Sequence, residues 1–473
     1  MHSHALRRAA VCACLAAGSA AAQPIPDTQS LRREIDALRA DYEARLRALE
    51  QRLNAAEAAL ARPPAAPPAV LAEPAAPAAP AAPAAVAAAP PAAPPAAQPT
   101  AAGRGLLDLS MILSGQYQRT QRDPASYRIR GFPLPPDAEI GPGTRGFSLA
   151  ESELTLAANV DPWFRGVGTF AVSPDNEIEV EEAFVQTTAL GHGLGLKAGR
   201  FLSGIGYLNA QHAHVWDFAD APLAYQAMLG TQFKDDGLQF TWLAPTDRFF
   251  ELGLEAGRGR GFPGSDTARN GAGAWALTAH VGDDIGASHS WRAGVSYLHA
   301  QASDQPLLAT DAAGNDTATA FTGRTRVWIA DAVWKWAPQG NATRRNFKLQ
   351  AEYLRSTRDG ELAAGGPAST GSFRAAQSGW YLQAVYQFMP RWRVGLRTER
   401  LDPGTPELGG NTGLGLDTGR ARKHTAMVDY NPSEFSRIRL QLAQDHARPG
   451  GASDLQWWLQ YQMSLGAHGA HSF

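Results

Sequence analysis

Cysteine is nearly absent from this sequence, which contains only Cys12 and Cys14. Both lie within residues 1–22, where two arginines precede an apolar stretch that ends in three alanines. This order of features is typical of a secretory signal peptide, so we expect export through the Sec pathway and cleavage after Ala22. The mature chain would then have no thiol, no disulfide and no cysteine-bound metal.

Charge and long apolar runs are also scarce. Charged residues make up 19% of the chain and the formal net charge is -2, too small an imbalance to suggest a nucleic-acid partner. After residue 22, no apolar run is long enough for a membrane helix. If the chain lies in a membrane, it must do so as a closed barrel, because only helices and closed barrels pair all their backbone groups in lipid.

Catalytic signatures are missing as well. The sequence contains neither G-x-S-x-G nor H-E-x-x-H. The glycine-rich stretch 257–261 lacks the strand-to-helix context that a phosphate-binding loop requires. We therefore predict no catalytic residues and no cofactor.

Two segments precede the main part of the chain. In residues 28–61, leucines and other apolar residues recur at spacings of three and four, which predicts an α-helical coiled coil. A single amphipathic helix on a membrane surface is the alternative, but the polar face carries both signs of charge. Residues 62–102 are almost entirely alanine and proline, which predicts an extended, disordered spacer. Together they would form a periplasmic stalk that could reach the cell wall.

From residue 106 onward, apolar and polar residues alternate, which predicts β-strands. Near the end, Trp457, Leu459 and Tyr461 alternate with polar residues, and the sequence closes on Phe473. An ordinary edge strand would also alternate. A long, aromatic-rich final strand, however, resembles the closing strand of a bacterial outer-membrane barrel.

Counting such segments over 106–473 predicts sixteen strands, an even number, as in bacterial single-chain barrels. Short and long links also alternate, as expected when both chain ends lie on one side of a membrane. The short links include 161–162 and 390–391, and the long ones include 202–233, 300–324 and 356–378. We therefore predict an all-β fold, a sixteen-stranded antiparallel transmembrane β-barrel preceded by the coiled coil and the linker.

The polar faces of these strands carry charge, and charges would face a hydrated interior rather than lipid. We expect an acidic wall in the first half and a basic wall in the second, which together would set ion selectivity. The alternative is that these groups merely pair with their neighbours. The predicted pore-lining residues are Glu151, Glu153, Arg165, Glu179, Glu181, Lys197, Arg292, Lys348, Arg393, Arg397, Lys423, Arg437 and Arg439.

The link 202–233 is too apolar for a free surface loop, so we expect it to fold inward and constrict the pore. Its candidate functional residues are Tyr207, His212, His214, Trp216, Asp217 and Asp220. His212 and His214, with nearby carboxylates, could hold zinc or a similar ion. The alternative is a hydrogen-bonded pair that only shapes the constriction.

Two segments resemble a known family. The sequence V-E-E-A-F-V at Val180–Val185 and K-A-G-R-F-L-S-G-I-G-Y-L-N at Lys197–Asn209 are similar to those of the phosphate-selective porin O and P family. The His-containing loop resembles a subgroup labelled zinc-regulated or receptor-like. The resemblance implies a sixteen-stranded barrel over 106–473, trimeric assembly and passive solute diffusion, with anion preference in some members.

The leading hypothesis is a homotrimeric porin in the bacterial outer membrane that passes small hydrophilic solutes or ions. A second hypothesis is a metal or substrate receptor for zinc-related uptake. A third is an envelope tether or adhesin that grips the cell wall through the N-terminal stalk.

Overall fold

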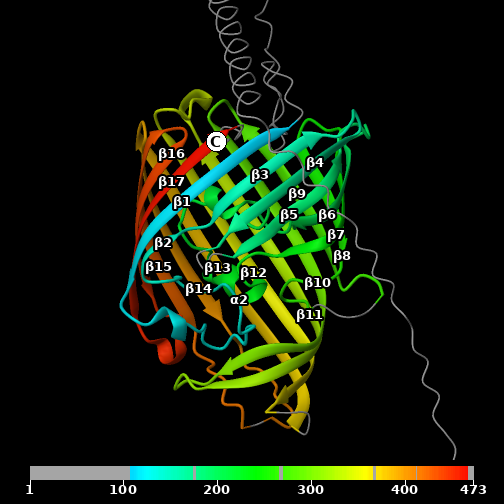
Figure 1. Cartoon of the computed structure of the whole chain (residues 1–473), viewed down its shortest axis with the longest axis vertical. Helices are drawn as coiled ribbons and strands as arrows, with labels where there is room; N and C mark the ends of the chain where they lie inside the picture. The colour runs from blue at the N-terminus through cyan, green and yellow to red at the C-terminus, as the bar shows by residue number, and fades with distance from the viewer. Residues whose placement is uncertain (1–106, 174–176, 266–269, 366–368, 412, 467–473) are drawn as a thin grey trace, which may run out of the picture. The chain divides into compact units, whose positions relative to one another are not determined.

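The computed structural model describes residues 107–173, 177–265, 270–365, 369–411 and 413–466 (Figure 1). The predicted signal peptide, coiled coil and spacer lie outside these residues, as does Phe473. The strands are β1 (Asp108–Thr120), β2 (Gly146–Leu149), β3 (Ser152–Asn159), β4 (Phe164–Val172), β5 (Ile178–Thr187), β6 (Leu194–Leu202), β7 (Lys234–Leu243), β8 (Phe249–Gly257), β9 (Ala274–Ile285), β10 (His289–Thr310), β11 (Asp316–Trp336), β12 (Asn346–Ala364), β13 (Thr370–Met389), β14 (Trp392–Asp402), β15 (Ala421–Ser433), β16 (Ser436–Asp445) and β17 (Asp454–Gly466). The helices are the α-helix α2 (Leu223–Leu229) and the 3-10 helices η1 (Pro124–Ser126), η2 (Ala213–Val215), η3 (Pro338–Gly340) and η5 (Pro449–Gly451).

The sheet closes on itself. The first strand, β1, pairs antiparallel with the last, β17, from Ser110 opposite Gly466 to Thr120 opposite Gln456. The sheet contains seventeen strands, but β2 and β3 both pair with β1 and follow one another along its edge. They therefore occupy one position in the wall, and the barrel has sixteen positions, which confirms the predicted sixteen-stranded antiparallel barrel (Figure 1).

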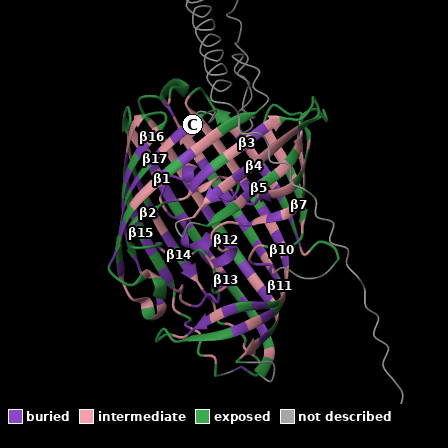
Figure 2. Ribbon diagram, in the orientation of Figure 1, coloured by how far each residue is buried: buried purple, intermediate pink, exposed green. Residues whose placement is uncertain are grey.

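The two faces of the wall differ in chemistry. Along β17, Leu455, Trp457 and Leu459 are exposed on the outside, whereas Gln456 and Gln460 are buried on the inside. The same alternation of exposed and buried residues runs along the other strands and produces the banding of Figure 2. Since successive side chains of a strand point to opposite faces, the outer surface is apolar and most of the inner face of the wall is polar.

Two predicted loops are mostly strand. β10 and β11 are 22 and 21 residues long, and β12 and β13 are 19 and 20 residues long. The sequence-based expectation of long links at 300–324 and 356–378 is therefore wrong. The hairpins extend because their ends bury an apolar cluster of their own, which includes Phe321, Leu362 and Phe373.

Helical structure is sparse in the described part of the chain. The α-helix α2 spans 7 residues, all of them buried. Among the described residues, no helix has the length and apolar character needed to cross a membrane. The largest apolar cluster joins α2 to inward-facing wall residues such as Val327, Ile329 and Leu354. It also contains Tyr127 and Phe132 from the connection between β1 and β2.

Candidate functional site: the charged interior

The connection between β6 and β7, residues 203–233, folds into the barrel, and we call it the inner loop (Figure 1). Its two ends are joined by Asn209, which is 0% exposed. The side-chain amide of Asn209 donates to the backbone oxygens of Ser203 and Phe233, each at 2.8 Å, and its Oδ1 accepts from the amide of Phe233 at 2.8 Å. Sequence reasoning gave Asn209 no role, yet its amide fixes the base of the loop.

The inner loop reaches carboxylates on several sides of the barrel. Glu255 of β8 accepts from the amide of Gly204 at 2.8 Å. Glu352 of β12 accepts from the hydroxyl of Tyr225 at 2.7 Å and from two loop amides at 3.1 Å each. Glu399 of β14 accepts from the first amide of α2 at 2.5 Å. Because these strands are far apart around the wall, the loop extends across the interior.

The two aspartates of the inner loop face the basic side of the wall. Asp217 pairs with Lys348 and, at 3.3 Å, with Arg393; Asp220 pairs with Arg397 at 2.8 Å and with Lys423 at 2.6 Å. Burial alone would raise the pKa of each aspartate, but the neighbouring cations hold the pKa of both below the ordinary value. The loop thus neutralises much of the predicted basic wall.

Two further arginines of that wall hold the loop backbone. Arg437 donates to the carbonyl oxygen of His214 at 2.9 Å, and Arg439 donates to that of Trp216 at 3.1 Å. Arg439 also pairs with Asp429 at 2.8 Å. The indole of Trp216 is buried and donates to a loop carbonyl, so Trp216 packs the loop rather than lining an open path.

The histidines of the loop face the opposite, acidic side. Nδ1 of His212 lies 2.9 Å from Glu181 and 3.3 Å from Glu153, Nε2 of His212 lies 3.0 Å from Glu182, and Nδ1 of His214 lies 2.7 Å from Glu153. Burial would lower the pKa of His212, but the hydrogen bonds that its imidazole donates to three carboxylates raise it well above the ordinary value. The three carboxylates therefore favour the protonated form of His212 over the neutral form.

Two β-bulges bring the carboxylates of this side together. In the pairing of β4 with β5, Thr169 lies opposite Glu182 and Phe170 opposite Val180, so Glu181 is an extra residue. A bulge lets consecutive side chains turn to one face, and both Glu181 and Glu182 are buried. Strict alternation would have placed Glu182 outside, which is why sequence reasoning missed it.

The second bulge lies at the junction of β2 and β3. On β1, Gly115 pairs with Leu149 and Ile112 pairs with Glu153. The two β1 residues are three positions apart, whereas their partners are four positions apart, so the β2–β3 side has one extra residue. The extra residue accompanies Glu151, whose carboxylate lies within 4.8 Å of those of Glu153 and Glu181. Both bulges therefore aim acidic side chains at the place where the inner loop presents its histidines.

The structure separates residues that the sequence analysis grouped. Asp217 and Asp220 bind the basic wall, so the carboxylates near His212 and His214 come from β3 and β5 instead. The remaining predicted lining residues have local partners: Arg165 pairs with Asp108 at 3.1 Å, Glu179 pairs with Lys234 at 2.9 Å, Lys197 lies 4.4 Å from the centre of the Phe184 ring, and Arg292 lies 5.5 Å from that of Tyr207.

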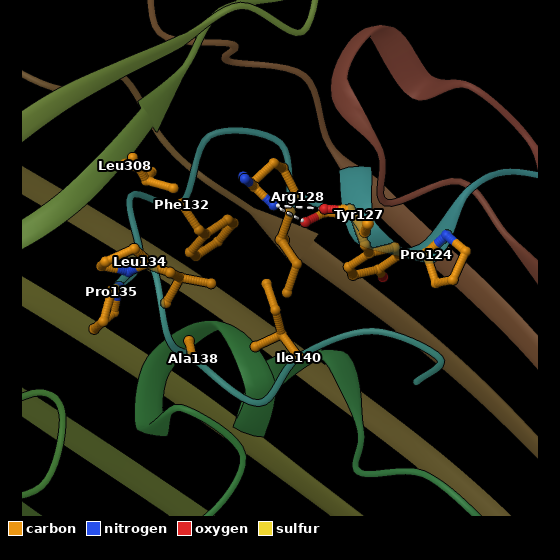
Figure 3. A pocket seen from close by; sticks show the side chains of 12 residues that line it. Pro124, Tyr127, Arg128, Phe132, Leu134, Pro135, Ala138, Ile140 and Leu308 are labelled. Atoms are coloured by element: carbon orange, nitrogen blue, oxygen red, sulfur yellow. Dashed lines mark hydrogen bonds between the residues drawn. The ribbon is translucent and has the colours of Figure 1, made fainter. Parts of the chain in front are cut away.

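A small pocket lies in the connection between β1 and β2, residues 121–145. Its volume is about 170 Å³, and its walls include Phe132, Leu134 and Ile140 (Figure 3). Arg128, the charged residue in this lining, already pairs with Asp316 at 3.0 Å. The connection also bonds to the inner loop, since the amide of Gly141 donates to Gln226 of α2 at 2.8 Å. The pocket is lined by this connection and by Leu308 of β10, so it is a packing gap within the connection.

Comparisons with known proteins give one sequence relative and several similar folds. No protein-family model matches the chain. An uncharacterized protein of Aquifex aeolicus is 32% identical over 344 residues, which cover 70% of each chain.

Among solved structures, a loop-deletion mutant of OmpT from Vibrio cholerae is 10% identical with a TM-score of 0.47, covering 76% of this chain and 99% of that one. The anion-selective porin from Comamonas acidovorans is 10% identical with a TM-score of 0.46, covering 76% and 99%. OprB of Pseudomonas putida is 14% identical with a TM-score of 0.46, covering 76% and 94%.

Proposed function

The chain belongs to the same family as the uncharacterized Aquifex aeolicus protein, and from its own structure we propose that it is an outer-membrane channel for passive diffusion of small hydrophilic solutes and ions. The outer face of the barrel is suited to contact with lipid. Exposed leucines, tryptophans and tyrosines, such as Leu459, Trp457 and Tyr461, cover a closed sheet with a polar interior. In water, a contiguous apolar surface of this kind would drive aggregation; in a bilayer, it is the face of a transmembrane barrel.

The inner loop defines the narrow part of the proposed path. It extends across the interior and is held on the basic side by buried ion pairs, so solutes would pass between the loop and the rest of the wall. For the assembly, we propose what the sequence predicts, a homotrimer with its stalk in the periplasm. Cross-linking and light scattering of the purified full chain would test the trimer.

An asymmetry of charge carries the proposal of selectivity. On the basic side, six cations face five carboxylates, two of which come from the inner loop. The cations are Lys348, Arg393, Arg397, Lys423, Arg437 and Arg439, and the carboxylates are Asp217, Asp220, Glu399, Asp429 and Asp445.

On the acidic side, the charges are less balanced. Within the described ranges, no lysine or arginine forms an ion pair with Glu151, Glu153, Glu181 or Glu182, and the partners of the last three are histidines. A ring or cluster of carboxylates favours cations in a channel. We therefore propose a preference for cations, which differs from the anion preference that the family resemblance suggested for some members.

The test is the reversal potential of the purified channel in a planar bilayer under a KCl gradient, without divalent metal. We expect a potential of the sign that marks cation preference. The E153Q/E181Q variant should shift it toward zero or toward anions, because two carboxylates are lost. A matched control, Glu407→Gln, changes an exposed glutamate paired with Arg374 and should leave the potential unchanged. A folded protein that never conducts would refute the channel, and an anion-preferring wild type would refute the charge argument.

A further inference from the structure

We infer that the acidic side of the interior is a binding site for one divalent transition-metal ion, formed by Glu153, His212 and His214 with Glu181 as a fourth ligand. This inference goes beyond permeation and does not require it. Its ligand set differs from the one that sequence spacing suggested, because both carboxylates come from the barrel wall and neither comes from Asp217 or Asp220.

The geometry of the donors suits such an ion. One ligand atom from each of Glu153, His212 and His214 lies within 4.8 Å of the others. In a tetrahedral zinc site with bonds of about 2.0–2.1 Å, donor atoms lie roughly 3.3 Å apart. The carboxylate of Glu153 meets Nδ1 of His214 at 2.7 Å and Nδ1 of His212 at 3.3 Å, so small side-chain movements would reach that spacing.

The chemistry of the donors selects the class of ion. Two imidazoles with carboxylates suit zinc and similar transition metals, whereas calcium and magnesium prefer sites made of oxygen ligands. The imidazoles of His212 and His214 stack with ring centroids 5.6 Å apart, so both present Nδ1 on the side of Glu153. The ion would take the place of the protons that these Nδ1 atoms share with the carboxylates, and binding would release those protons to solvent.

The fold provides a second, independent reason. Two β-bulges, in β5 and at the β2–β3 junction, turn Glu181, Glu182 and Glu151 toward the same place as Glu153. Four carboxylates then converge around two histidines, and Glu153, Glu181 and Glu182 are at most 7% exposed. Bulges are common beside functional sites because they re-aim side chains, and excess negative charge at a buried place favours a bound cation.

Metal binding would have a structural consequence. The ion would join the side chains of His212 and His214 to β3 and β5, in addition to the hydrogen bond by which Arg437 holds the backbone of His214. It would also reduce the negative charge beside the proposed path. We therefore expect bound zinc to weaken the cation preference of the channel.

The experiment uses the full chain, purified in detergent without a histidine tag, stripped with EDTA and dialysed against zinc. We expect one zinc ion per chain, and binding that is not displaced by millimolar magnesium. The H212Q/H214Q variant should lose it, with an affinity at least about tenfold weaker, since even partners of metal ligands contribute 10- to 100-fold. The control H424Q/H446Q changes one histidine of β15 and one of the connection between β16 and β17, neither of which belongs to the cluster, and should keep the site. His424 is exposed on β15.

Folding of every variant is checked by the heat-dependent shift in gel mobility that folded barrels show. If H212Q/H214Q does not fold, the E153Q variant replaces it, and cobalt replaces zinc as the probe. Tetrahedral cobalt gives intense visible bands in the wild type, and E153Q should weaken them. Substoichiometric zinc in the wild type, or unchanged binding in H212Q/H214Q, would overturn the inference. A protein that conducts but binds no zinc refutes only the metal site, and one that binds zinc but never conducts refutes only the channel.

Discussion

The substitution Asp220→Asn gives the sharpest test of how the inner loop is held. The carboxylate of Asp220 accepts from Arg397 at 2.8 Å, from Lys423 at 2.6 Å and from Gln441 at 2.7 Å. The side chains of Arg397 and Lys423 are 1% and 0% exposed, so water cannot replace the lost partner. Asparagine keeps the shape and some hydrogen bonding but leaves two buried cations with less negative charge.

The expected penalty follows from the burial of this network. Removing one partner of a buried ion pair costs about 3–5 kcal/mol. At about 1.36 kcal/mol per factor of ten, this is a roughly 150- to 5,000-fold shift of the loop toward its undocked state. Glu399 and Asp445 remain beside the two cations, so we expect the lower part of this range.

Chymotrypsin cleavage of the folded protein measures this shift. The inner loop contains Tyr207, Trp216, Phe218 and Tyr225 as cleavage sites, and the last three are buried. We expect D220N to be cut in the loop much faster than the wild type and to show a larger or noisier single-channel conductance. The control Asp137→Asn changes an exposed aspartate and should behave as the wild type. Wild-type cleavage together with wild-type conductance in D220N would refute the proposed role of the ion pairs.

Three further predictions concern the loop and the turns. The folded-state pKa values of Asp217 and Asp220 lie below their unfolded values. Their contribution to docking of the inner loop is therefore complete above about pH 4 and is lost only as the pH falls through the lowered values. Conductance noise that rises between pH 7 and 5 would contradict this. Asn209→Ala leaves buried backbone groups of Ser203 and Phe233 unpaired, which costs about 1–3 kcal/mol each. Chymotrypsin should therefore cut the loop faster, while the barrel still shows its heat-dependent shift on gels. Unchanged cleavage would show that Asn209 is dispensable. Gly193→Ala should lower the urea midpoint of unfolding more than Gly191→Ala, although both glycines have positive φ (74° and 71°). An added Cβ at Gly193 would lie only 2.0 Å from the backbone oxygen of Leu243, whereas one at Gly191 meets nothing within 4 Å. Equal midpoints would exclude the clash.

Local pattern gave a correct prediction of the barrel. Alternation along β17 and the other strands marks an apolar outer face and a polar inner face, and this information is carried by adjacent residues. The same reasoning failed at 300–324 and 356–378, where strands continue. Those residues pair across hairpins and bury Phe321 against Phe373, with ring centroids 5.8 Å apart, and a contact between distant segments leaves no periodic signal in either one.

For the inner loop, too, the sequence predicted one feature and not another. Its apolar composition predicted that 202–233 folds inward, and the structure places it inside the barrel. The partners of its charged residues were not predictable from spacing. Asp217 and Asp220 lie within eight residues of His212, which suggested a shared site, yet the chain turns so that the aspartates meet β12, β14 and β15 while the histidines meet β3 and β5.

The sequence by itself determined the fold class, the even number of wall positions and the inward loop, because each depends on which residue types follow one another. Only the tertiary structure decided which charges cancel and which converge. Bulges at Glu181 and beside Glu151 break the alternation by one residue, and pairing across the sheet, not the local sequence, sets where such a shift occurs. The proposed cation preference and the proposed metal site both rest on that three-dimensional placement of carboxylates.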